Sequence, residues 1–167
     1  MTGRLDEIAR DVAHGPVRLV KLIGDAAMLA SADTEAVVGA TLDLLEGMAR
    51  GGEGFPLIRA GIASGPVLSR GGDFYGAPVN LANRITGAAR PGSVLVTSEV
   101  RAETEESFEF SAAGRKHLKG IHGTVEIHRC RDLNEGDASE DEGSSDHAGE
   151  RGKGSRRRRR RRRTRPI

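Results

Sequence analysis

The spacing of apolar residues changes repeatedly along the first 131 residues of this sequence, and the pattern stops at about Asp132. Residues 17–23 alternate with period 2, as a strand does, whereas residues 34–50 place apolar side chains at helical spacing. Short strand-like runs and helical segments then continue to alternate up to residue 130. Interleaved elements of this kind predict an α+β or α/β sandwich around one mixed sheet.

The expected elements follow from these periods and from the turn residues between them. Residues 1–15 predict an amphipathic helix, and residues 17–31 predict a hairpin with Gly24-Asp25 as its two-residue turn. Asp33 is expected to cap a helix that continues to about Arg50. The remaining expectations are two short strands joined by Ser64-Gly65 within residues 57–69, a loop at 70–78, a helix from Pro78 to about Ala89, a strand at 94–98, a short helix at 98–106, and strands at 108–110 and 124–130.

Composition excludes several classes of protein. Cys130 is the single cysteine, so an internal disulfide and a Cys-based zinc site are excluded, and a cytoplasmic location is expected. Apolar runs fall well short of the roughly 20 residues that span a bilayer, so no membrane segment is expected. Residues 1–131 carry 15 Lys/Arg and 16 Asp/Glu, which gives no electrostatic argument for nucleic-acid binding by this part.

The tail, residues 132–167, is predicted to be disordered, because it has no apolar periodicity and its first part, residues 132–155, is acidic and rich in Gly and Ser. It contains eight consecutive arginines, Arg156 to Arg163. Such a run could bind nucleic acid or another polyanion in a salt-dependent, sequence-independent way. A solvated run that folds back on the acidic segment 135–150 is the more common outcome for such a composition.

Lys21 is unusual because it lies in the middle of the expected apolar strand. A buried lysine is costly unless it reaches water or a partner, and its ammonium suits a base nitrogen or a carboxylate. Asp25 follows at the hairpin tip. A Gly-Asp pair is most often only a turn, although a carboxylate there could also bind Mg²⁺.

A second set of polar residues lies in the stretch GDFYGAPVNLANRITGAARPG. Asn80 and Arg84 are four residues apart and share one face of the expected helix, where a simple exposed face is the ordinary explanation. Asp73, in the Gly-rich stretch just before, is close to the start of the same helix. A guanidinium group beside a side-chain amide is well suited to bind a phosphate and a sugar. Lys119, in HLKGIHG, is by itself an ordinary surface lysine.

Four stretches, VKLIGDAAMLA, RAGIASGPV, GDFYGAPVNLANRITGAARPGSVLVTSEV and FEFSAAGRKHLKGIHGTVEIHRC, resemble the class III nucleotidyl cyclase catalytic domain in order and spacing. The resemblance covers about residues 15–130, and the pattern G-D-x-x-G-x-x-V-N-x-A-x-R is specific. It implies an α+β fold, a ferredoxin-like mixed-sheet sandwich, for residues 1–131.

The resemblance also implies roles for individual residues. Lys21 and Asp73 match the pair that reads adenine, a combination that selects ATP, whereas a Glu/Cys-type pair would suggest GTP. Asn80 matches the residue that orients the ribose, and Arg84 matches the one that stabilises charge on the α-phosphate. Lys119 matches the lysine that holds the terminal phosphates, and Asp25 matches the second of two aspartates that bind Mg²⁺ or Mn²⁺.

The first strand of the family, F-x-D-I-x-G-F-[ST], carries the other metal-binding aspartate and has no counterpart before Lys21. Asp6 and Asp11 fall in the expected first helix and do not substitute for it. We therefore expect an incomplete metal site and a sheet with an unpaired edge and an open apolar face.

The resemblance implies a homodimer, or a heterodimer with another cyclase domain, whose sites draw on both subunits. The expected function is conversion of ATP to cyclic AMP and pyrophosphate, with little activity from this chain alone. The alternative is a non-catalytic nucleotide-binding or regulatory subunit, and a further alternative is nucleic-acid binding by the arginine tail.

Overall fold

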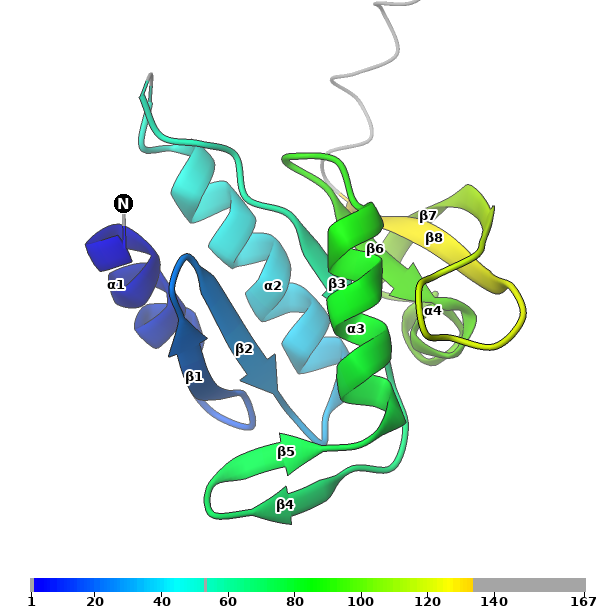
Figure 1. Ribbon diagram of the computed structural model, residues 1–167. Helices are drawn as coiled ribbons and strands as arrows, with labels where there is room; N and C mark the ends of the chain where they lie inside the picture. Colours follow the sequence, from blue (N-terminus) through cyan, green and yellow to red (C-terminus); the bar gives the residue numbers. More distant parts are fainter. Residues whose placement is uncertain (1, 53, 134–167) are drawn as a thin grey trace, which may run out of the picture.

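The computed structural model describes residues 2–52 and 54–133 (Figure 1). In chain order the elements are α1 (Thr2–Val12), β1 (Arg18–Ile23), β2 (Ala26–Ala30), α2 (Thr34–Ala49), β3 (Ala60–Ile62), β4 (Leu68–Arg70), β5 (Asp73–Tyr75), α3 (Ala77–Ala88), β6 (Val94–Thr97), α4 (Ser98–Thr104), β7 (Phe108–Lys116) and β8 (Val125–Asp132). The mixture of helices and strands confirms the predicted α+β class.

The strands form three sheets rather than one. The largest has the order β3-β6-β8-β7, with β3 parallel to β6 and the other two pairs antiparallel. Strands β1 and β2 form a separate antiparallel pair, as do β4 and β5. The β1–β2 hairpin turns at Gly24, whose φ of 60° lies in the left-handed region that glycine tolerates. The predicted hairpin and its turn are confirmed.

Helices cover both faces of the four-stranded sheet. One face packs against α2 and α4 through a cluster that includes Val38, Ile62 and Val100. The other face packs against α3 through a cluster that includes Ile85 and Ile127. Gly61 lets α3 approach closely, because a Cβ there would lie 2.4 Å from the backbone nitrogen of Thr86.

A third apolar cluster joins α1, α2 and the β1–β2 hairpin. Leu5 and Ala9 of α1 pack there against Leu44 and Met48 of α2. Helix α2 begins as predicted, since the Asp33 carboxylate accepts a 3.0 Å hydrogen bond from the third backbone N–H of the helix. These contacts place the hairpin on the same helix that supports the larger sheet.

Two expectations about the middle of the chain are wrong. Residues 57–69 do not form a hairpin joined by Ser64-Gly65, because β3 pairs with β6 and β4 pairs with β5. The expected loop at 70–78 contains β5, which turns back on β4 through Gly71 and Gly72, both with positive φ. The Gly-rich sequence is thus a tight hairpin turn with a short strand after it.

The expected alternation along β1 is also interrupted. The register shifts between Leu19 and Lys21, which is a bulge that inserts one residue opposite β2. Leu19 packs in the third cluster, whereas Ile23 is 60% exposed instead of sharing a buried face with it. In the last part of the body, β7 continues to Lys116 and is longer than the expected strand at 108–110.

The predicted disordered tail, with Arg156 to Arg163, lies outside the described residues, apart from its first two positions. Within residues 2–52 and 54–133, the helices are too short or too polar to cross a membrane.

Candidate functional site

The structure brings Lys21 and Asp73 together from two separate hairpins. The Lys21 Nζ atom lies 2.5 Å from the Asp73 Oδ2 atom, and the two side chains are 36% and 24% exposed. The second carboxylate oxygen accepts a 2.8 Å hydrogen bond from the Phe74 backbone N–H. Arg18 lies three residues before Lys21 on β1, and its guanidinium carbon is 5.6 Å from the centre of the Phe74 ring. The β4–β5 hairpin is therefore held against β1 at this pair.

The environment of Asp73 keeps it ionised. The hydrogen bond from Lys21 lowers the pKa of the Asp73 carboxyl below its ordinary value, and the Phe74 backbone N–H lowers it further. An ionised carboxylate accepts hydrogen bonds only, while the lysine ammonium only donates them. The pair therefore presents one fixed acceptor beside one fixed donor, at a surface that remains accessible.

Asn80 and Arg84 lie on α3, and both are exposed. The helix begins after Gly76, with Pro78 in its first turn, and the Asn80 backbone N–H donates to the Gly76 carbonyl. Neighbouring Ile85 is fully buried against the larger sheet. This burial fixes the rotation of α3 and directs the Asn80 and Arg84 positions to its outer side, as the helical spacing predicted.

Lys119 lies in the connection between β7 and β8 and is exposed. Its neighbours Leu118 and Ile121 pack in the cluster with Ile85 of α3, and the Ile121 backbone N–H donates to the Leu118 carbonyl. This turn therefore carries the Lys119 ammonium on a segment anchored to the helix that bears Arg84.

Asp25 lies at the tip of the β1–β2 hairpin and is exposed. It lines the same large cavity as β2, α2 and β3. Across the described parts of the chain, no three His, Cys, Asp or Glu side chains converge in a way that could hold a metal ion. One exposed carboxylate does not fit the coordination that Mg²⁺ or Mn²⁺ requires, so these residues do not form a metal site by themselves.

The six residues thus form groups rather than one contiguous site. Lys21 and Asp73 are in contact, Asn80 and Arg84 share α3, and Lys119 is on a turn attached to that helix. Arg18 and Phe74 support the pair and were not singled out from the sequence, where no spacing relates them. The exposure of the polar groups leaves them available to a ligand or to a second protein.

Residues 1–131 match the family described as the adenylate and guanylate cyclase catalytic domain. The chain belongs to this family, and the resemblance inferred from its motifs is confirmed.

Relatives in this family include adenylate cyclases of several bacteria. A pH-sensitive adenylate cyclase of Mycobacterium tuberculosis is 44% identical over 136 residues, covering 78% of this chain and 34% of the relative. An adenylate cyclase of Streptomyces griseus is 41% identical over 85 residues, covering 51% of this chain and 21% of the relative. The chain therefore spans about a third or less of the length of these curated relatives.

Solved structures confirm the fold. The adenylyl cyclase CyaB of P. aeruginosa superposes with a TM-score of 0.63 at 21% identity, covering 78% of each chain. The catalytic core of a rhodopsin-guanylyl cyclase with converted specificity, solved in complex with ATPαS, gives a TM-score of 0.64 at 25% identity, covering 77% of this chain and 76% of the other.

Proposed function

We propose that this chain supplies the base-reading and charge-stabilising residues of an adenylate cyclase site, which converts ATP to cyclic AMP and pyrophosphate. The observation that carries the proposal is the contact between Lys21 and Asp73, 2.5 Å between Nζ and Oδ2. Adenine presents an acceptor ring nitrogen beside a donor amino group. A fixed ammonium donor beside a fixed carboxylate acceptor complements that edge.

The remaining polar residues act on the sugar and the phosphates in this proposal. Asn80 orients the ribose. The 3′-hydroxyl releases its proton to water as its oxygen forms a bond to the α-phosphorus, while the bond from that phosphorus to pyrophosphate breaks and pyrophosphate leaves with the electron pair. Arg84 stabilises the charge that develops on the α-phosphate, and Lys119 holds the terminal phosphates. Such a reaction depends mostly on positioning and on charge neutralisation. The family relationship and the adenylate cyclase relatives support these roles.

A second cyclase subunit completes the site in this proposal, as a homodimer or as a heterodimer. Among the described residues Asp25 is one carboxylate where Mg²⁺ or Mn²⁺ needs several oxygen ligands, and in this proposal the complementing subunit supplies the metal-binding carboxylates of the shared site.

The proposal is tested by mixing the chain with a complete cyclase domain whose own motif asparagine and arginine are changed to alanine. Cyclic AMP is expected from the mixture and not from either protein alone. Asn80→Ala in the present chain, which keeps the helix intact, serves as the control and abolishes the rescue. A mixture that forms a complex but makes no cyclic AMP would refute the proposed role.

The alternative is a nucleotide-binding or regulatory subunit without catalysis, and the lack of a group of metal-binding side chains among the described residues favours it. That alternative predicts ATP binding by the chain and no turnover with any cyclase partner. A cytoplasmic location and polyanion binding by Arg156 to Arg163 remain predictions from the sequence.

A further inference from the structure

The bulge in β1 places two cationic side chains on one face of the strand. Arg18 lies opposite Ala30 of β2 and Lys21 lies opposite Met28, so Val20 is the extra residue of the bulge. Ala30 and Met28 are two residues apart and share one face of the hairpin, and Arg18 and Lys21 therefore share that face with them. In a regular strand, residues three positions apart point to opposite faces. The bulge thus brings the guanidinium and the ammonium side by side.

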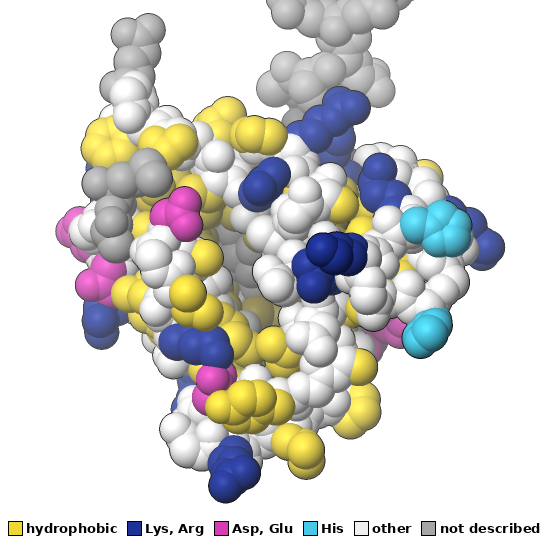
Figure 2. All heavy atoms as spheres, viewed as in Figure 1, with side chains coloured by type: hydrophobic (Ala, Val, Ile, Leu, Met, Phe, Trp, Pro, Cys, Tyr) yellow, Lys and Arg dark blue, Asp and Glu magenta, His cyan; other side chains and the backbone are white. Residues whose placement is uncertain are grey.

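These two cations contact consecutive residues of β5. The Lys21 Nζ atom is 2.5 Å from the Asp73 Oδ2 atom, and the guanidinium carbon of Arg18 is 5.6 Å from the centre of the Phe74 ring. Figure 2 shows basic, acidic and apolar side chains gathered where the β1–β2 hairpin meets the β4–β5 hairpin. Because neighbouring residues of a strand point to opposite faces, the two contacts hold β5 on both of its faces.

Strand β5 has little support from its own hairpin. It has three residues, and within the described part of the chain it pairs only with β4, which also has three. A two-stranded hairpin by itself is marginally stable at best in water. Its turn consists of Gly71 and Gly72, both at positive φ, and glycine adds conformational freedom there. The position of β5 therefore depends on contacts with other elements, among them the two contacts with β1.

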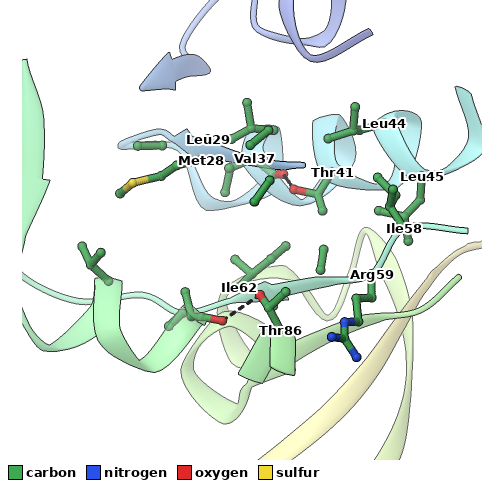
Figure 3. A pocket seen from close by; sticks show the side chains of 18 of the residues that line it. Met28, Leu29, Val37, Thr41, Leu44, Leu45, Ile58, Arg59, Ile62 and Thr86 are labelled. Atoms are coloured by element: carbon green, nitrogen blue, oxygen red, sulfur yellow. Dashed lines mark hydrogen bonds between the residues drawn. The ribbon is translucent and has the colours of Figure 1, made fainter. Parts of the chain in front are cut away.

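The Phe74 ring and the Asp73 carboxylate are linked through the backbone of β5. The ring lines the large cavity, into which side chains of β2, α2 and β3 project (Figure 3). The Phe74 backbone N–H donates a 2.8 Å hydrogen bond to the Asp73 Oδ1 atom. A rotation of β5 that moves the ring therefore also moves this N–H and the carboxylate. The cation–π contact with Arg18 opposes such a rotation.

We propose that Arg18 is a positioning residue for base selection, because its contact with the Phe74 ring holds the Asp73 carboxylate in the orientation that faces Lys21. Arg18 acts through Phe74 in this arrangement, and the bulge in β1 is what lets it do so from the same face as Lys21. The consequence for base selection rests on the proposed function. The orientation of Asp73 does not, since it can be measured without any turnover.

The test uses Arg18→Met, which removes the guanidinium, and Phe74→Leu, which removes the ring, each in the full chain. The titration of the Asp73 carboxyl carbon is followed by NMR. Each substitution should raise the pKa of Asp73 towards its ordinary value of 3.8, because the hydrogen bonds from Lys21 and the Phe74 N–H that lower it are loosened. In the complementation mixture with equal ATP and GTP, the ratio of cyclic AMP to cyclic GMP should fall about two- to fivefold for each variant.

A double-mutant cycle separates the contact from the mere loss of a charge. Arg18→Met combined with Phe74→Leu should be no worse than either substitution alone, because both remove the same contact. Arg101→Met removes an exposed arginine from α4 and should change neither measurement.

An unchanged Asp73 titration or an unchanged product ratio in Arg18→Met would overturn the proposal. So would an effect of Arg18→Met that Phe74→Leu does not share, or additive effects in the double variant. If the mixture with the unmodified chain makes no cyclic AMP, the proposed function fails, and the Asp73 titration alone decides whether Arg18 positions the carboxylate.

Discussion

Gly61 is the position where a single methyl group should do the most damage to the fold. Strand β3 lies directly against α3 at this residue, and a Cβ would meet backbone on the helix. It would lie 2.4 Å from the Thr86 nitrogen and 2.6 Å from the Ala82 carbonyl oxygen, where real Cβ contacts are essentially never shorter than 3.0 Å. Since both neighbours are backbone atoms, no side-chain rotation relieves the overlap. Gly61→Ala must move α3 away from β3.

Overpacking of this kind typically costs about 1–3 kcal/mol, and the backbone neighbours favour the upper part of that range. For a domain of this size, 1 kcal/mol corresponds to roughly 4 °C in melting temperature, so a decrease of about 4–12 °C is expected. Asn80 and Arg84 move with the helix, and activity in the complementation mixture should fall by more than the loss of folded protein explains.

Thermal unfolding followed by circular dichroism measures the effect of Gly61→Ala. Gly87→Ala is the matched control, because Gly87 lies in α3 with nothing within 4 Å of an added Cβ. This control should be neutral or stabilising by up to about 1 kcal/mol. An unchanged melting temperature for Gly61→Ala would contradict the claim that α3 packs too closely on β3 to accommodate an added methyl group.

The remaining predictions concern the helix cap, the buried thiol and the ion pair. Asp33→Ala removes the cap of α2 and should cost about 1 kcal/mol in chemical unfolding, whereas exposed Asp43→Ala should change stability little. Burial raises the pKa of the Cys130 thiol from its ordinary 9.0 to about 12, so the native protein should resist thiol reagents at neutral pH. Because the pKa of Cys130 is higher in the folded than in the unfolded chain, the neutral thiol contributes its full share of the free energy of unfolding below pH 9.0. That share is lost at up to about 1.4 kcal/mol per pH unit between pH 9.0 and about 12. The variant Cys130→Ala should not show this loss. Lys21 lowers the pKa of Asp73, so the stability difference between the chain and Asp73→Asn should persist above the ordinary value of 3.8 and shrink as the pH falls below it.

Local signals in the sequence were sufficient for most of the elements. The Gly24-Asp25 turn predicted the first hairpin, and Asp33 predicted the start of α2, because each depends on interactions within a few residues. Strand β5 was missed since it has three residues and follows two glycines, a pattern typical of a loop. The bulge before Lys21 was missed because it depends on pairing with β2.

The candidate residues were found through the motif, whereas their arrangement needed the structure. No local rule relates Lys21 to Asp73, since their contact depends on how the β4–β5 hairpin packs on β1. The expected unpaired edge proved to be two facing edges with a cavity between them, because β1–β2 and β3–β6–β8–β7 remain separate sheets. Non-local pairings of this kind leave little trace in the spacing of residues.

The most direct test of the central claim is a change of base specificity at the Lys21–Asp73 pair. The double variant Lys21→Glu, Asp73→Cys is mixed with the same complementing cyclase domain, and cyclic AMP and cyclic GMP are measured with ATP and GTP supplied together. If the pair reads adenine, cyclic AMP synthesis should fall and cyclic GMP should become the main product. Unchanged synthesis of cyclic AMP by the double variant would contradict the assignment of these two residues.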